Sequence, residues 1–156
     1  MKGKANGSKP QRSRTRRDPT RLLPPNYRPT RSEPFMNPVM RQHFRQKLWF
    51  WRNEILREAG LTMHALQTES LHEPDLTDRA SLETDISIAL RTRDRERKLL
   101  SKIDAALRRI EDGTYGYCEE TGEPISIRRL EARPIATFSV EAQERHERLE
   151  RTMRND

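Results

Sequence analysis

The feature that most constrains the fold is a long stripe of mostly apolar residues in the middle of the chain. Every step along this stripe is three or four residues, through Leu82, Ile86, Ala89, Arg93, Glu96, Leu100, Ile103, Leu107 and Ile110. This spacing keeps side chains on one face of an α-helix and is typical of a helix that packs along a seam against another. A helix is predicted to start near Asp78, which is a good N-cap, and to end at Gly113 in a left-handed C-terminal position.

A second stripe precedes the first one. It runs through Phe44, Leu48, Trp51 and Ile55, and Thr62 with Ala65 or Leu66 extends it more weakly. This helix is expected to begin at Asn37-Pro38, since Asn caps helices well and Pro is tolerated in the first helical position. Gly60 interrupts the pattern at a cost of about 1 kcal/mol relative to Ala.

The two helices must fold back on each other. Glu73-Pro74 marks a break, because a residue that precedes proline is pushed out of the helical region. We therefore predict a mainly α fold, with an antiparallel coiled-coil hairpin over residues 35–112 and a tip near 72–80. Arg93 and Glu96 lie on the seam, and they are either a polar layer that sets the register or a contact surface on the rod.

The N-terminal segment has a different composition. Residues 1–34 contain ten Lys or Arg against two acidic residues, a net charge of +8, whereas the whole chain carries +7. Six of the ten prolines also lie there. Because proline opposes helix formation and like charges repel, residues 1–34 are predicted to be a disordered basic tail.

A small module is predicted to follow the hairpin. Residues 113–138 are rich in turn-forming glycines and aromatics, and a charged C-terminal helix is expected over 139–156. The module resembles a zinc finger whose ligand positions are degenerate, namely Cys118, Thr121, Ser139 and Ala142. A single thiolate among such residues is a poor zinc site, so no metal is expected. Packing must then replace zinc, through Tyr115, Tyr117, Ile125, Ile127, Leu130, Ile135 and Phe138.

Several classes of protein are excluded by what the chain contains. No run of 18 apolar residues exists, so no membrane contact is expected. A single cysteine among 156 residues cannot form an internal disulfide, which favours the cytoplasm. The chain has no phosphate-binding glycine loop and no catalytic constellation, and its four histidines are scattered, so we do not expect an enzyme.

Cys118 has two possible roles. A redox-sensing thiol needs a depressed pKa, whereas the neighbouring Glu119 and Glu120 are expected to raise the pKa of this thiol. A packing role is therefore the simpler interpretation.

Three segments of the chain resemble the DksA/TraR family of RNA polymerase-binding transcription factors. Residues 93–99 (RDRERKL) resemble that family's second rod helix, and 75–80 (DLTDRA) resemble its tip. Residues 116–118 (GYC) and 127–134 (IRRLEARP) resemble its zinc-finger region, in a cysteine-poor, zinc-independent variant. The resemblance covers about residues 37–150.

The resemblance implies a function without catalysis. Family members enter the secondary channel of RNA polymerase, and with the alarmone ppGpp they modulate initiation at ribosomal RNA and amino-acid biosynthesis promoters in the stringent response. A monomer is expected, with ppGpp bound only at the interface with polymerase and no cofactor bound by the protein alone.

The resemblance also assigns roles to individual residues. Asp75, Asp78 and Ala80 match the tip residues that act at the polymerase active centre, and Arg95 matches a residue that binds polymerase. The positions that match the ppGpp site are Leu99, Lys102, Arg133 and Gln143. Gln143 replaces a family lysine, and the loss of a cation weakens an anion site.

Two alternatives remain open at this point. The basic tail could bind nucleic acid through Arg12, Arg14, Arg16 and Arg17, in a salt-dependent and sequence-independent way. The other interpretation of the tail is that it aids contact with upstream DNA or with polymerase. A structural coiled-coil adaptor would instead self-associate and be insensitive to changes at Asp75 and Asp78. Those two carboxylates could also be a turn former and an N-cap alone.

Overall fold

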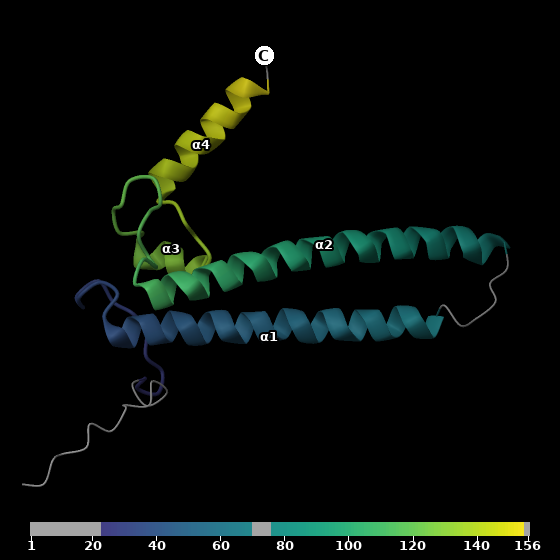
Figure 1. Ribbon diagram of the computed structural model, residues 1–156, viewed down its shortest axis with the longest axis horizontal. Helices are drawn as coiled ribbons and strands as arrows, with labels where there is room; N and C mark the ends of the chain where they lie inside the picture. Colours follow the sequence, from purple (N-terminus) through teal and green to yellow (C-terminus); the bar gives the residue numbers. More distant parts are fainter. Residues whose placement is uncertain (1–22, 70–75, 155–156) are drawn as a thin grey trace, which may run out of the picture.

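The chain forms a long two-helix rod with a small module at its base. The computed structural model describes residues 23–69 and 76–154. The helices are α1 (Pro38–Glu69), α2 (Leu76–Asp112), α3 (Ile127–Ala132) and α4 (Val140–Met153). In Figure 1, α1 and α2 lie side by side, α3 lies at the base of the rod, and α4 projects away from it. The predicted mainly α fold with an antiparallel hairpin is confirmed. None of the helices in these ranges is long and apolar enough to cross a membrane.

At the base of the rod, α1 begins and α2 ends where the sequence predicts. Asn37 caps α1, since its Oδ1 accepts a hydrogen bond of 2.9 Å from the amide of Met40. Gly113 has a φ of 78° directly after α2, and the amides of Thr114 and Tyr115 both donate to the Arg109 carbonyl at 3.0 Å. These two motifs stop the helices at the level where the module packs.

The start of α2 differs from the prediction. The helix begins at Leu76, so Asp78 lies inside its first turn and is not its N-cap. The residue before Leu76 is Asp75, which is of the same cap-forming type, but Asp75 lies outside the described residues. The predicted break at Glu73-Pro74 and residues 72–75 of the predicted tip also lie outside them.

The apolar core lies at the base of the rod. Met40, Phe44 and Leu48 of α1 and Ile103 and Ala106 of α2 are completely buried. The same cluster continues into the module through Tyr115, Ile125, Leu130, Ile135 and Ala136. An ion pair of 2.8 Å between Arg52 and Asp104 joins the two helices beside this core. The half of the predicted seam nearest the module is thus confirmed, and its side chains pack in one cluster with those of the module.

The half of the rod nearer the tip is packed loosely. Beyond Ile55, the remaining described part of α1 contributes no buried side chain, and Ile86 of α2 is 40% exposed. A cavity of about 160 Å³ lies between the helices there, and Arg93 and Glu96 are among its lining residues. Thr62 is exposed but lines this cavity, so it extends the stripe weakly as predicted, whereas Ala65 is exposed and does not line it. A Cβ at Gly60 would meet nothing within 4 Å, and nothing in the structure explains this glycine.

The segment before α1 packs onto the base of the rod. Met36 belongs to the core, and Phe35 stacks edge-on against Tyr117 with ring centroids 5.3 Å apart. Tyr27 lies edge-on to His43 and donates a 2.6 Å hydrogen bond to Glu33. Residues 23–34 therefore form turns and contacts where the sequence predicted a disordered tail. Residues 1–22 lie outside the description.

Gly116 is required by this packing. Its φ is 89°, and a Cβ there would lie 2.7 Å from Cε of Met36. Both the left-handed backbone and the close approach exclude a larger residue. The N-terminal segment and the module thus fit directly against each other.

The uneven packing predicts an uneven response to truncation along α2. Ile103→Ala removes a completely buried side chain and should lower the free energy of unfolding by about 2–5 kcal/mol. Ile88→Ala is the matched control in the same helix, because Ile88 is 55% exposed, and it should change the value by about 0.5 kcal/mol or less. Urea titration followed by circular dichroism measures both. Equal losses would contradict a core confined to the base.

Candidate functional site: a basic cavity at the base of the rod

The module is built around a short hairpin. The amide of Cys118 donates to the Glu123 carbonyl at 2.8 Å, and the amide of Ile125 donates to the Gly116 carbonyl at 2.7 Å. The hydroxyl of Tyr115 is buried and donates to the Pro134 carbonyl at 2.7 Å. Of the residues predicted to pack here, Tyr115, Ile125, Leu130 and Ile135 are buried, and Ile127 and Phe138 are partly buried. Tyr117 is 37% exposed, and it packs at the edge of the module against Phe35 instead of in the core.

Helix α3, which the sequence analysis did not predict, is clamped onto α1. Ser126 caps it by accepting a hydrogen bond from the amide of Arg129. Glu131 of α3 pairs with Lys47 at 2.8 Å and with His43, both on α1. Burial alone would raise the pKa of the Glu131 carboxyl, but the hydrogen bonds from Lys47 and His43 hold this pKa below its usual value. The clamp fixes α3, and with it Arg129 and Arg133, relative to the rod.

The four degenerate finger positions have taken on other structural roles. Ser139 is the N-cap of α4, and its Oγ accepts a 3.2 Å hydrogen bond from the amide of Ala142. The hydroxyl of Thr121 accepts a hydrogen bond from the amide of Glu123 at 3.3 Å. Ala142 is completely buried as part of the core. One thiol, two hydroxyls and a methyl group do not form a zinc site, which needs four strong nitrogen or sulfur ligands. Among the residues that the structure describes, no cluster of three or more His, Cys, Asp or Glu could hold a metal.

Cys118 packs in the core, but its acidity differs from the expectation. Its side chain is 3% exposed, as a packing role requires. Burial raises the pKa of the thiol, but the hydroxyl of Thr121 and the backbone amides of Ser139, Thr121 and Glu120 lower it to about 7. The sequence predicted a raised pKa from Glu119 and Glu120. That prediction is wrong, because the folded loop directs backbone amides toward the sulfur.

A basic cavity lies where α2, the module and the start of α4 meet, and we call it the basal cavity. Its volume is about 580 Å³, within the range of small-molecule sites. Two acidic side chains, Asp112 and Glu119, line it, and so do five basic ones, Lys102, Arg108, Arg109, Arg129 and Arg133. Ile135 and Phe138 provide an apolar wall. A cavity with this excess of cations can bind an anion that also carries an apolar group.

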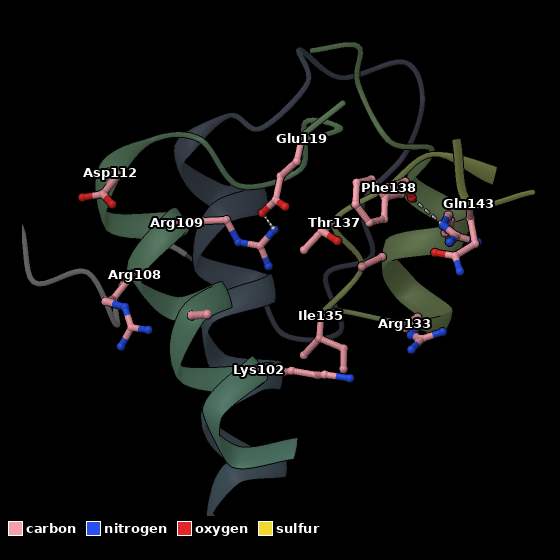
Figure 2. A pocket seen from close by; sticks show the side chains of 13 residues that line it. Lys102, Arg108, Arg109, Asp112, Glu119, Arg133, Ile135, Thr137, Phe138 and Gln143 are labelled. Carbon is pink, nitrogen blue, oxygen red and sulfur yellow. Dashed lines mark hydrogen bonds and ion pairs between the residues drawn. The ribbon is translucent and has the colours of Figure 1, made fainter. Parts of the chain in front are cut away.

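Three of the four residues assigned to the ppGpp site line this cavity together. They are Lys102 from α2, Arg133 from the end of α3 and Gln143 from α4. In Figure 2, Lys102 extends toward Arg133 below Ile135. The side-chain amide of Gln143 donates a hydrogen bond of 3.0 Å to the carboxylate of Glu147. Leu99 does not line the cavity but is partly buried against the core, one helical turn before Lys102.

The sequence analysis missed three cations of the cavity. Arg109 lies seven residues after Lys102, on the same face of α2, so the helical period itself could have identified it. Arg129 stands one turn before Arg133, and its Nε donates to the Phe138 carbonyl at 2.9 Å. Arg108 is an exposed residue near the end of α2 and also lines the cavity.

The remaining predicted site residues lie far along the rod. Asp78 and Ala80 are in the first turns of α2, and Ala80 is exposed. Arg95 is exposed near the middle of α2. Since the start of α2 lies at the opposite end of the rod from the module in Figure 1, the candidate residues form two separate regions.

Two family descriptions match the chain. Residues 40–110 match the N-terminal domain of DnaK suppressor protein DksA. Residues 113–148 match the prokaryotic dksA/traR C4-type zinc finger. The matches meet at the boundary between the rod and the module. The zinc implied by the second description does not fit the four positions present here.

Similar proteins from several bacteria match this chain over most of its length. The RNA polymerase-binding transcription factor DksA of Caulobacter vibrioides is 64% identical over 131 residues, which cover 84% of this chain and 92% of that protein. The factor of the same name from Escherichia coli K12 is 42% identical over 81% of this chain and 84% of that protein. The structure of transcription factor DksA2 from Pseudomonas aeruginosa matches with a TM-score of 0.71 and 41% identity, over 75% of this chain and 90% of that one.

The altered finger positions make a prediction about zinc. Because the module packs without a four-ligand set, adding EDTA or zinc should leave the unfolding temperature of the wild type unchanged. The triple variant Thr121→Cys, Ser139→Cys, Ala142→Cys restores four thiolates with Cys118 and should bind about one zinc per chain. Thermal unfolding and metal analysis measure both effects. A wild type that unfolds at a lower temperature in EDTA would contradict a zinc-free module.

Proposed function

The chain belongs to the DksA/TraR family, and we propose that it binds RNA polymerase and acts through the secondary channel of that enzyme. As a member of this family it is a transcription factor and not an enzyme. The observation that carries the proposal is the rod. With 32 and 37 residues, α1 and α2 are about 48 and 55 Å long, and only two helices make up the rod's width. A rod of this shape can enter a channel that excludes a globular domain.

The tip is the part that acts on the active centre. Asp75, Asp78 and Ala80 reach the interior of polymerase when the module rests on the channel rim, and Arg95 contacts the channel wall. Asp78 and Ala80 stand at the start of α2, at the far end of the rod from the module, as this arrangement requires. Carboxylates on such a tip can interact with basic or metal-bound groups in the partner.

The basal cavity binds ppGpp at the interface with polymerase. Lys102 and Arg133 bind phosphates, and Gln143 offers an amide where other family members supply a cation. Arg108, Arg109 and Arg129 line the same cavity and offset that loss of charge. We therefore expect ppGpp to strengthen the effect of the factor on initiation.

The same proposal covers the cellular role. The factor acts as a monomer in the cytoplasm, and with ppGpp it modulates initiation at ribosomal RNA and amino-acid biosynthesis promoters in the stringent response. The arginines that carry the alternative function, nucleic-acid binding by the tail, lie in residues 1–22 and outside the described part of the chain.

An initiation assay tests the proposed function. Wild-type protein should inhibit a bacterial RNA polymerase at a ribosomal RNA promoter in the presence of a zinc chelator, and ppGpp should increase the inhibition. The double variant Asp75→Asn/Asp78→Asn should still bind polymerase but lose most of the inhibition, because the tip carboxylates are gone.

The matched control removes two carboxylates from the base. Glu111→Gln/Glu123→Gln changes the net charge equally at two exposed positions that do not line the basal cavity, and it should behave as wild type. Wild-type protein that neither binds polymerase nor changes initiation would refute the proposal.

A further inference from the structure

Arg109 is an arginine whose hydrogen-bonding capacity is not filled. Its side chain is 15% exposed, and its Nε is buried without a hydrogen-bond partner in the described part of the chain. Its Nη1 lies 3.4 Å from Oε1 of Glu119, which is long for a hydrogen bond between charged groups. A buried, unsatisfied donor on a charged group is energetically costly. This guanidinium can therefore gain stronger hydrogen bonds by donating to a better-placed anion.

Glu119 is placed to be a replaceable partner. Its amide donates to the Thr137 carbonyl at 2.9 Å, which fixes its backbone at the wall of the cavity. Its side chain is 54% exposed, so the carboxylate can turn into solvent without being buried elsewhere. An ion pair that is long and has one solvent-exposed partner is weak and easily broken. Figure 2 shows the carboxylate of Glu119 pointing toward the guanidinium of Arg109.

We propose that Arg109 is a further phosphate-binding residue of the basal cavity and that Glu119 is its internal competitor. A phosphate that enters the cavity displaces the Glu119 carboxylate and takes its place on Arg109. This inference rests on the proposed function in that it concerns the same anion site, but it can be tested without polymerase. Glu119 thus lowers the affinity of the basal cavity for phosphates, whereas the five basic side chains that line the cavity raise this affinity.

Binding of inorganic pyrophosphate to the full chain tests the proposal by isothermal titration calorimetry at an ionic strength of about 0.15 M, where charges on the surface are screened. Glu119→Gln should bind pyrophosphate about three to ten times more tightly than wild type, because it removes both the competing ion pair and a repelling charge. Glu123→Gln is the matched control, since Glu123 is exposed on the same loop and does not line the cavity. This control should change affinity by less than about twofold, because an exposed charge outside the cavity is screened.

Two further variants connect the effect to the cavity and to Arg109. Lys102→Gln should abolish most pyrophosphate binding. In an Arg109→Gln background, Glu119→Gln should give a clearly smaller gain than in wild type, because it then removes only a repelling charge and no competing ion pair. Because Arg109 is largely buried, circular dichroism must show that its variants are folded, and Arg109→Lys provides a second test, since it keeps the charge but loses the forked guanidinium.

The outcomes separate this inference from the proposed function. Equal effects of Glu119→Gln and Glu123→Gln would overturn it, and so would pyrophosphate binding that Lys102→Gln does not weaken. An absence of pyrophosphate binding to both wild type and Glu119→Gln would also overturn it. A protein that binds pyrophosphate as expected but does not alter initiation would instead refute the proposed function and leave this inference standing.

Discussion

The structure depends on one apolar core at the base of the rod. Phe44 of α1, Ile103 of α2 and Tyr115 of the module are all buried in the same cluster, and Met36 joins it from the N-terminal segment. Phe44 and Tyr115 stack with ring centroids 5.5 Å apart. The core therefore performs two tasks together, since it holds the two long helices side by side and supports the module through apolar packing.

This arrangement leaves the two functional regions with different physical properties. The basal cavity is built on well-packed elements, and the Glu131 clamp fixes the helix that carries Arg129 and Arg133. The half of the rod near the tip has exposed apolar side chains and a cavity in its seam, so little packing energy specifies its shape. In the proposed function, such a rod adjusts to the walls of the polymerase channel, while the basal cavity keeps its geometry.

Much of the fold could be predicted from the sequence, because its signals are local. Asn37 and Gly113 mark a helix start and a helix end through their own backbone preferences, and the period of three and four residues identified the seam. Helix α3 has six residues, too few to show a period. The lowered pKa of Cys118 depends on backbone amides that only the folded loop brings to the sulfur. Likewise, the proximity of Arg109 and Glu119 arises from the way the module folds back onto α2.

In the proposed mode of action, the base of the rod stays at the channel rim while the tip reaches the active centre of polymerase. The most direct measurement replaces the active-centre Mg²⁺ with Fe²⁺ in the complex and maps where the resulting hydroxyl radicals cut an end-labelled chain. We expect the cuts to cluster within residues 72–80 and to spare the module and α4. Cuts confined to the module or to α4, or a chain that binds polymerase without being cut at the tip, would contradict this mode of action.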